Sequence, residues 1–396
     1  MPASRPRFQL AELDLPPLRA APELLRLPAN AIPALVRSAH ADPDLAQMAM
    51  QMYYLLQTIG EPGFALEMQA RALALRQLYR LAGSERPALR LLALMGPGDM
   101  SDNAPFDFVV DGSDIALDLL YLQPGLALPA VLPEHDLAIV AIGQSEANAA
   151  LLDWAEACIA GWPRPVLNRP AGIRRCARDR VWQLLRGVPG LCVPATRRLR
   201  PAELADGRLP LTLRPLDTHG GKGLVRVETP AERAAWIAAQ PLGDDGPEWY
   251  AADYIDYRSA DGQFRKYRIA LIDGRPFLCH LAIDGHWIVH YQSAGMGLDA
   301  AKQAEEAAAM AGFETGFALR HRAALAAIAE AIALEYLVID CSELADGRLL
   351  LFEVDGGAWI HAADVALLPY KAPHMARTFA AFRALLLDRS TARAAR

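Results

Sequence analysis

The feature that most constrains the fold is a predicted β-hairpin near the C-terminus, in the segment LVIDCSELADGRLLLFEVDGG at residues 337–357. Its centre is the dipeptide Asp346-Gly347, which favours a two-residue type I′ turn, and apolar, β-prone residues flank it on both sides. A two-residue loop places Ala345 opposite Arg348, and every other pair across the two strands follows from that register.

Three carboxylates lie on this predicted hairpin. In that register Asp340 faces Glu353, and Asp355 shares their face because strand side chains repeat every second position. Acidic groups on one face repel one another and are costly to desolvate, and a bound divalent cation reverses that cost. Oxygen-only ligands favour Mg²⁺ or Mn²⁺ over zinc. The alternative is a solvated hairpin edge with scattered acids.

Length and composition bound the class of protein. The 396 residues suffice for two or three packed units, and 53% of them are apolar. A net charge of −6 argues against nucleic-acid binding through bulk positive charge. The five cysteines lack C-x-x-C spacing, which argues against a zinc ribbon or a disulfide framework and fits a reducing compartment. With no signal-peptide pattern and no membrane-length apolar run, we expect a cytoplasmic protein without membrane or nucleic-acid partners.

The N-terminal part, from about Pro16 to Gly83, has a helical pattern. Asp42-Pro43 is a favourable helix start, Gly60 can end that helix, and a second amphipathic helix runs from 61 to 83. The pair predicts an αα-hairpin that is weakly similar to a tetratricopeptide unit. Either it is a helical extension packed on the main body, or it docks a peptide or partner.

The next segment alternates apolar runs with amphipathic ones. We expect strands at 89–95, 106–110 and 136–143, with helices or crossovers at 114–122 and 146–162. This alternation predicts a parallel α/β layer. The glycines that follow the first run lack the G-x-G-x-x-G context, so a dinucleotide site of the Rossmann type is not expected.

A glycine-rich stretch, Asp217 to Gly223, joins two further β-runs. Because it connects strand to strand, it does not have the layout of a P-loop. Its backbone N–H groups can still form a nest over phosphates, and the alternative is an unselective turn.

Two more Asp-Gly turns, at 273–274 and 284–285, predict a three-stranded meander. Two-residue loops place Arg268 opposite Cys279, and Cys279 opposite His290. Lys266 and Arg268 then share one face, and buried cations are rare unless an anion is near. His290 by itself is equally consistent with a satisfied residue of the sheet.

The order of these pieces carries a resemblance. An opening segment VLNRP is followed by the hairpin LTLRPLDTHGGKGL, the strand WYAADYID, the basic strand KYRIALIDGRPF and the acidic hairpin VIDCSELADGRLLLFEVDGG. From about residue 90 to 361 the chain resembles the ATP-grasp superfamily, and within it the branch of ribosomal-protein-S6 glutamate ligases and glutathione synthetases.

The resemblance implies an α/β and α+β fold, to which the helical pattern at the N-terminus adds an α-helical extension. The expected parts are the helical extension at 1–88, a pre-ATP-grasp α/β domain at 89–167, a first lobe at 168–240 with the glycine hairpin, and a second lobe at 241–396 with the metal hairpin. It implies that ATP and Mg²⁺ (or Mn²⁺) lie between the lobes. A carboxylate takes the γ-phosphoryl group to give an acylphosphate, and an amine or a thiol then displaces phosphate.

The resemblance also implies residue roles. Arg180 and Arg214 stand where the family commonly has phosphate-binding lysines, and Lys222 adds a phosphate contact from the loop. Lys266 stands where related ligases often have an acid. The remaining implied residues are Gly220 and Gly221 over the phosphates, Asp253, Tyr254 and Ile255 beside adenine, Arg268 at the transferred phosphate, and Asp340, Glu353 and Asp355 at the metal. His290 or His361 is the candidate base for the incoming amine.

The sequence does not name the substrates. Arg258, Arg265 and Lys266 suggest an anionic substrate, such as an amino acid or a peptide carboxylate, and they fit a solvated face equally well. Alternatives to a carboxylate–amine ligase are an ATP-grasp kinase and a non-catalytic ATP-binding scaffold whose helices recruit a partner. A homodimer is left open.

Overall fold

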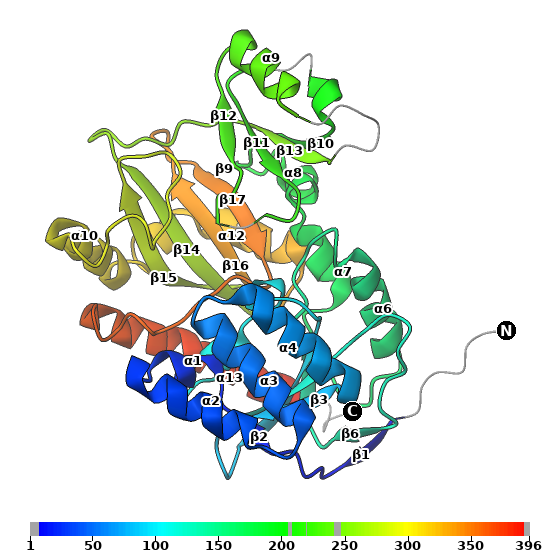
Figure 1. Cartoon of the computed structure of the whole chain (residues 1–396). Coiled ribbons are helices and arrows are strands. Elements are labelled where there is room, and N and C mark those ends of the chain that lie inside the picture. Colours follow the sequence, from blue (N-terminus) through cyan, green and yellow to red (C-terminus); the bar gives the residue numbers. More distant parts are fainter. Residues whose placement is uncertain (1–7, 205–207, 219, 241–246, 392–396) are drawn as a thin grey trace.

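The computed structural model describes residues 8–204, 208–218, 220–240 and 247–391. Strands within these ranges form four sheets, arranged as a body that carries the N-terminal helices and two smaller sheets stacked beyond it (Figure 1). A short parallel pair, β1 (Gln9–Ala11) and β6 (Val131–Pro133), lies at the edge of the body. Within the described ranges, no helix combines the length and the apolar character needed to cross a membrane.

The body is built on a sheet of six described strands in the order β2-β3-β5-β4-β7-β8. Neighbouring strands are parallel except β3 and β5, so the predicted α/β layer is present. Its strands are β2 (Pro17–Leu18), β3 (Leu78–Leu81), β4 (Leu89–Met95), β5 (Ile115–Tyr121), β7 (Leu137–Val140) and β8 (Val166–Leu167).

The N-terminal helices pack on one face of this sheet and share its hydrophobic core (Figure 1). They are α1 (Ala21–Leu25), α2 (Ile32–His40), α3 (Leu45–Thr58) and α4 (Pro62–Leu75). The cap of α3 is Asp44 and not Asp42, because the Asp44 carboxylate accepts the N–H groups of residues 46 and 47. The strands β2 and β3 belong to the body sheet, so segment 1–88 is not structurally separate from 89–167.

Three sequence predictions in the body are wrong. The second helix ends at Leu75, and residues 78–81 form strand β3. Residues 106–109 form helix α5 (Phe106–Val109) and not a strand, while segment 114–122, expected to be a helix or a crossover, contains strand β5. Short apolar runs fit either a buried strand or a buried helix, and pairing with β3 and β4 on both sides decides for β5.

Helix α6 (Ala149–Ile159) follows β7, and the chain then leaves the body through α7 (Pro170–Ile173) and α8 (Arg178–Leu185). Asn168 ties this exit to the second lobe, because its amide exchanges hydrogen bonds of 2.8 and 3.0 Å with the backbone of Tyr336. Single turns of 3₁₀ helix lie at Ala29–Ala31, Met100–Asp102, Arg174–Cys176, Pro201–Leu204 and Pro369–Lys371.

The first lobe is a sheet of four described strands in the order β10-β13-β11-β12, with the paired strands antiparallel. Its elements are β10 (Thr196–Leu199), β11 (Leu211–Pro215), β12 (Val225–Val227), α9 (Pro230–Ala238) and β13 (Trp249–Asp253). The predicted glycine-rich connection runs between the antiparallel strands β11 and β12, although residue 219 lies outside the described residues.

The second lobe is a sheet of five described strands in the order β15-β14-β16-β17-β9. Its strands are β9 (Leu191–Cys192), β14 (Phe264–Ile272), β15 (Arg275–Asp284), β16 (Tyr336–Glu343) and β17 (Leu349–Asp355). Its helices are α10 (Ala300–Ala311), α11 (Phe317–Arg320), α12 (Arg322–Ile332) and α13 (Ala372–Thr391), and α13 packs against both this lobe and the body.

The expected three-stranded meander is wrong, because the chain after Asp284 does not return as a strand in the described structure. The register of β14 and β15 also differs. A bulge leaves Cys279 without a partner across the pair, so Arg268 faces His280. A bulge inserts one residue and shifts all pairs beyond it, which a count from the turn cannot foresee.

The acidic hairpin has the predicted pair Asp340–Glu353, but its loop length and the register next to the loop differ from the prediction. The loop holds three residues, since Leu344 pairs with Arg348 and Ser342 with Leu350. A bulge at Phe352 in β17 then shifts the register back by one residue. The longer loop and the bulge compensate, and the carboxylates still face each other.

Candidate functional site

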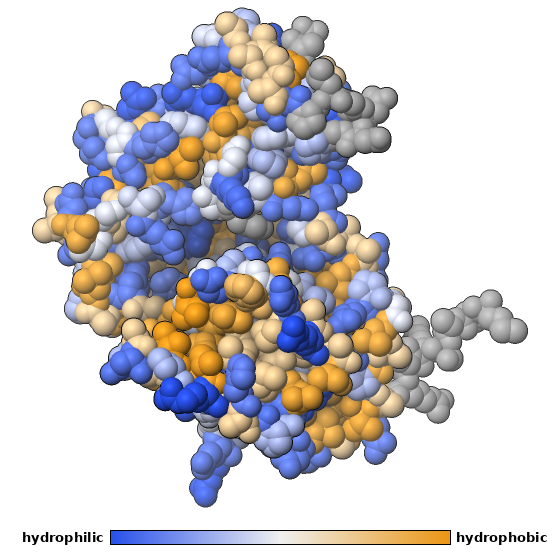
Figure 2. Space-filling view, viewed as in Figure 1, coloured by the Kyte–Doolittle hydropathy of each residue, from blue (hydrophilic) through white to orange (hydrophobic). Residues whose placement is uncertain are grey.

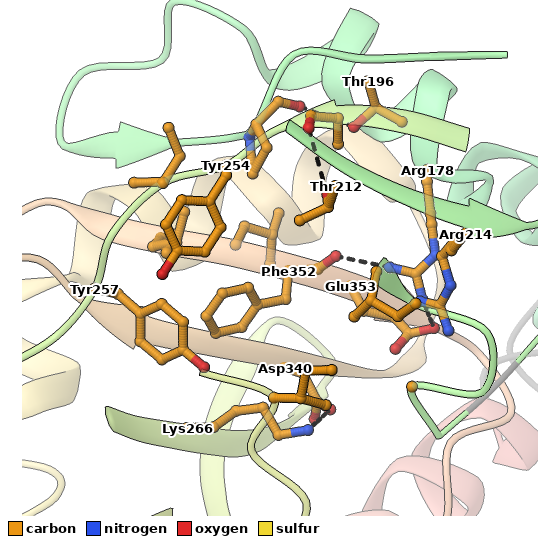
Figure 3. Close-up of a pocket in the computed structure, with 18 of the residues that line it drawn as sticks. Arg178, Thr196, Thr212, Arg214, Tyr254, Tyr257, Lys266, Asp340, Phe352 and Glu353 are labelled. Carbon is orange, nitrogen blue, oxygen red and sulfur yellow. Dashed lines mark hydrogen bonds and ion pairs between the residues drawn. The ribbon is translucent and has the colours of Figure 1, made fainter. Parts of the chain in front are cut away.

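The pocket that holds most of the predicted residues lies between the first and second lobes. It is lined by side chains from β11 and β13 on one side and from β14, β16 and β17 on the other. Figure 2 shows a hollow in the middle of this face of the molecule. Figure 3 shows the rings of Tyr254, Tyr257 and Phe352 on one side, Arg178, Arg214 and Glu353 on the other, and Lys266 with Asp340 along the lower edge between them.

The first end is apolar and aromatic. The rings of Tyr257 and Phe352 pack edge to face with their centroids 4.8 Å apart. The ring centroids of Tyr254 and Trp287 are 5.6 Å apart, and the two ring planes are at 90° to each other. The apolar lining residues of this pocket include Val181, Val193, Leu224, Ala252, Ile255, Val289, Leu350 and Leu351. Such a wall suits a flat, weakly polar ring system.

The second end is cationic. Arg178, Arg214, Lys266 and Arg268 line it together with the carboxylates of Asp340 and Glu353. Among the described lining residues the four cations exceed the three carboxylates, which include Asp253, so the pocket favours an anion. Figure 3 shows the guanidinium groups of Arg178 and Arg214 side by side next to Glu353.

Asp340 is buried, with 5% of its surface exposed, and both of its oxygens are occupied. The oxygens accept hydrogen bonds from Arg268 Nε at 2.8 Å, Arg268 Nη2 at 3.0 Å and Lys266 Nζ at 3.1 Å. Burial alone raises the pKa of an acid, but the cations Arg268 and Lys266 hold the pKa of Asp340 well below its ordinary value. Asp340 is therefore ionised across the physiological range and fixes both cations in the pocket.

Arg214 and Arg178 are held by different partners. Arg214 donates to the Thr218 carbonyl at 2.7 Å, whereas Arg178 donates to the Phe352 carbonyl at 3.0 Å and pairs with Glu353. Burial, followed by repulsion from Arg178, lowers the pKa of Arg214 to about 10. Arg214 therefore stays charged at neutral pH. It is a buried cation that donates to the neutral oxygens of Thr218, so a bound anion relieves its desolvation.

His290 lies beneath the glycine hairpin, and a Cβ on Gly220 would come within 3.4 Å of its Nε2 atom. Burial, together with the nearby Lys266 and Arg268, lowers the pKa of His290, so the imidazole is neutral at neutral pH. Gly220 and Gly221 have φ values of +67° and +73°, a backbone region that side chains with a Cβ rarely adopt.

Eleven of the predicted site residues line this pocket. They are Arg214, Gly220, Gly221, Asp253, Tyr254, Ile255, Lys266, Arg268, His290, Asp340 and Glu353. Arg180, Lys222 and Asp355 are not among its lining residues.

The structure places Arg180 outside the lining of the pocket. Helix α8 begins at Arg178, and that side chain lines the pocket, whereas Arg180 is exposed and donates to Gln183 at 3.0 Å. Two positions apart on a helix is about 200°, so only one of the two arginines can face the pocket. Lys222 is exposed as well.

The predicted metal site is not assembled. In the part of the chain that the structure describes, no group of three His, Cys, Asp or Glu side chains is placed to hold a metal ion. Asp340 is paired with two cations, Glu353 is paired with Arg178, and Asp355 lines a neighbouring small cavity and accepts the Gly357 N–H at 2.7 Å. The carboxylates do not fit a preformed Mg²⁺ site, because their charge is already compensated by arginine and lysine.

Sequence reasoning missed several lining residues, including Arg178, Thr196, Thr212, Tyr250, Tyr257 and Trp287. The ARDR motif at 177–180 carried the signal for Arg178, but the motif alone does not say which of its two arginines faces the pocket. The aromatic residues come from separate loops and strands, and no local pattern brings them together.

The arginines proposed for an anionic substrate have other partners. Arg265 makes two hydrogen bonds with Asp261, at 2.8 and 3.0 Å, and also pairs with Glu305. Arg258 lies over the ring of Phe264 at 5.2 Å. Neither is among the residues that line the pocket, so of the three candidates only Lys266 faces it.

Several solved structures are similar to this chain. An ATP-grasp protein of the RimK domain type from Sphaerobacter thermophilus shares 18% identity over 73% of this chain and 98% of its own, with a TM-score of 0.42. D-alanine–D-alanine ligase from Bacillus anthracis, solved with ATP, shares 15% identity over 76% and 97% of the two chains, with a TM-score of 0.44. L-amino acid ligase from Bacillus licheniformis shares 16% sequence identity over 72% of this chain and 70% of its own, with a TM-score of 0.36.

These likenesses concern the fold. No protein-family model matches the sequence, and no curated protein does. Because these sequence identities are low, the chemistry of this chain is inferred from the residues of its own pocket.

Proposed function

We propose that this chain is an ATP-dependent ligase of the ATP-grasp type, which joins a carboxylate to an amine or a thiol. The observation that carries the proposal is the pocket between the lobes, which aromatic rings and several cationic side chains line together. A nucleoside triphosphate has the same two-part character, a flat base and a chain of negative charge.

The proposed chemistry has two steps. A carboxylate oxygen of the first substrate attacks the γ-phosphorus of ATP, ADP leaves, and an acylphosphate forms. The amine or thiol of the second substrate then attacks the acyl carbon, the C–O bond to phosphate breaks, and inorganic phosphate leaves. Phosphoryl transfer of this kind depends mainly on positioning and on neutralising the oxygens.

The residues of the pocket fit these needs. Arg178 and Arg214 can hold phosphate oxygens through planar guanidinium groups. Arg268 and Lys266, which Asp340 keeps in place, lie where charge on the transferred group can be neutralised. Neutral His290 can accept the proton that an incoming ammonium loses. No step is routed through a metal ion, because the acidic residues are already paired.

The cysteines are poor candidates for a covalent mechanism. Burial raises the pKa of the Cys279 thiol to about 12, and the pKa of Cys341 is raised by burial and by the charge of Asp340. The thiolate is the reactive form, so neither group is a ready nucleophile at neutral pH.

Calorimetry with ATP and the wild-type protein tests the first part of the proposal. We expect binding that Arg214→Gln weakens by about tenfold or more, the cost of one charge-assisted hydrogen bond, while Arg180→Gln leaves it unchanged. Absence of ATP binding to the wild-type protein would refute the proposed function.

An ADP-release screen over mixtures of carboxylates with amines or thiols tests the second part. We expect release of ADP and phosphate in equal amounts, and only when both substrates are present. ADP release with a stable phosphoester and no free phosphate would instead indicate a kinase. ATP binding without ADP release for any pair would favour a scaffold.

A further inference from the structure

The turn after β11 is fastened to the body of the protein. The Asp217 carboxylate accepts hydrogen bonds from the backbone N–H of Glu146 at 2.7 Å and of Ala147 at 3.1 Å, through a different oxygen for each. These two residues lie in the loop between β7 and α6, about 70 positions earlier in the chain. The contact therefore joins the first lobe to the body.

A second bridge reaches the same loop from the same lobe. Arg198, on β10, pairs with the carboxylate of Glu146 at 2.6 Å and with Asp179 of helix α8 at 3.3 Å. The backbone N–H groups of loop 144–148 thus bind the carboxylate of Asp217 after β11, and the side-chain carboxylate of Glu146 in the same loop binds Arg198 on β10. Two contacts of opposite polarity define one position of the lobe on the body better than a single contact does.

The backbone of Asp217 supports a specific role for this contact. Its φ is +56°, which is uncommon for residues other than glycine and which aspartate tolerates better than most. A strained conformation of this kind persists only where surrounding contacts hold it, and it is a reason to look for a functional constraint. The two bonds to loop 144–148 are such contacts.

The fastened turn also positions a cation of the pocket. Arg214 Nη2 donates to the Thr218 carbonyl at 2.7 Å, and its Nε donates to Thr218 Oγ1 at 3.4 Å. Thr218 Oγ1 in turn donates to the Pro215 carbonyl at 2.9 Å, which closes the turn around the guanidinium. Because Thr218 directly follows Asp217, the direction of its carbonyl depends on where Asp217 is held.

We propose that Asp217 is a positioning residue, which fastens the β11–β12 turn to loop 144–148 and thereby holds Arg214 in the nucleotide pocket. The expected effect of Asp217 on ATP binding rests on the proposed function, whereas the contact between Asp217 and loop 144–148 does not. Asp217 acts through Thr218 and Arg214 and is not among the residues that line the nucleotide pocket.

Amide hydrogen exchange tests the fastening without ATP. Asp217→Gly removes the carboxylate and tolerates the positive φ, and Asp217→Asn keeps one acceptor oxygen. We expect exchange at the N–H groups of Glu146 and Ala147 to become about fivefold faster in Asp217→Gly, the size of a lost helix cap, and to change less in Asp217→Asn. Asp273→Gly is the matched control, because Asp273 also has a positive φ, +49°, in the exposed turn between β14 and β15. Unchanged exchange at 146 and 147 would overturn the fastening.

Calorimetry with ATP then tests the positioning. We expect Asp217→Gly to weaken ATP binding by roughly tenfold, Asp217→Asn to weaken it less, and Asp273→Gly to leave it unchanged, since a misplaced binding group loses much of its contribution. Faster exchange combined with unchanged ATP affinity would refute the positioning of Arg214. If the wild-type protein does not bind ATP, the proposed function fails, and the exchange measurement alone decides whether Asp217 fastens the turn.

Discussion

Replacing Asp340 by asparagine should destabilise the protein as well as impair the site. The substitution keeps the shape of the side chain but removes the carboxylate charge that compensates Arg268 and Lys266 at 2.8–3.1 Å. All three groups are mostly shielded, with side-chain exposures of 6% for Asp340, 21% for Arg268 and 15% for Lys266. The free energy of unfolding should therefore fall, because two cations remain in a poorly solvated pocket without this anion.

Breaking a buried ion pair by removing one partner typically costs about 3–5 kcal/mol. Because the introduced asparagine retains one acceptor oxygen and both cations keep some solvent contact, we expect a cost near the lower end, about 3 kcal/mol. That is a large part of the roughly 5–15 kcal/mol that stabilises a typical folded domain. A double variant, Asp340→Asn with Arg268→Gln, should lose less than the sum of the single variants, since one unpaired cation is removed as well.

Urea unfolding followed by tryptophan fluorescence and circular dichroism measures this effect. The control is Asp346→Asn, in the exposed turn of the same hairpin, which should leave the midpoint close to that of the wild type. The pH dependence gives a second check: the pKa of Asp340 is lowered in the folded state, so its contribution is present at neutral pH and is lost as the pH falls below about 4. An Asp340→Asn variant as stable as Asp346→Asn would show that the pairing does not stabilise the fold.

Three other sites give further predictions. Arg178→Met should weaken ATP binding by about tenfold or more in calorimetry, whereas Arg180→Met, two positions along the same helix, should leave it within about twofold. Gly221→Ala should weaken binding as well, because its Cβ would approach Ile288 within 3.1 Å, while Gly262→Ala, at a φ of +82° with open space around it, should affect only stability. Burial raises the pKa of Asp107 to about 7, so the folded state holds a proton that the unfolded chain releases between about pH 4 and 7. Stability should fall as the pH rises through that window, and Asp107→Asn should flatten the profile of unfolding midpoint against pH; a profile unchanged by the substitution would contradict the assignment.

Local patterns predicted the elements whose signals are strong and short in range. The Asp346-Gly347 turn, the apolar runs on both sides of it and the alternation of Lys266 with Arg268 are all visible in the sequence, and the structure contains each. The two hairpins of the second lobe were predictable for this reason, since antiparallel strands joined by tight turns depend on neighbouring residues, although their registers and the expected third strand of the meander were not.

Predictions failed where one residue of offset or one distant partner decides the outcome. The start of α8 selects Arg178 over Arg180, and a bulge selects His280 over Cys279 as the partner of Arg268. Strand β5 was expected to be a helix or a crossover, because its apolar run is compatible with several structures until its neighbours in the sheet are known.

The sequence by itself determined which residue types carry charge and where tight turns form, because both depend on the residues and their immediate neighbours. It did not determine which charges neutralise one another. Asp340 was expected to bind a metal, and folding instead places two cations from the adjacent strand β14 against it. Only the tertiary structure decides such pairing, since the energy of a buried charge depends on every group within a few ångströms, whatever its distance along the chain.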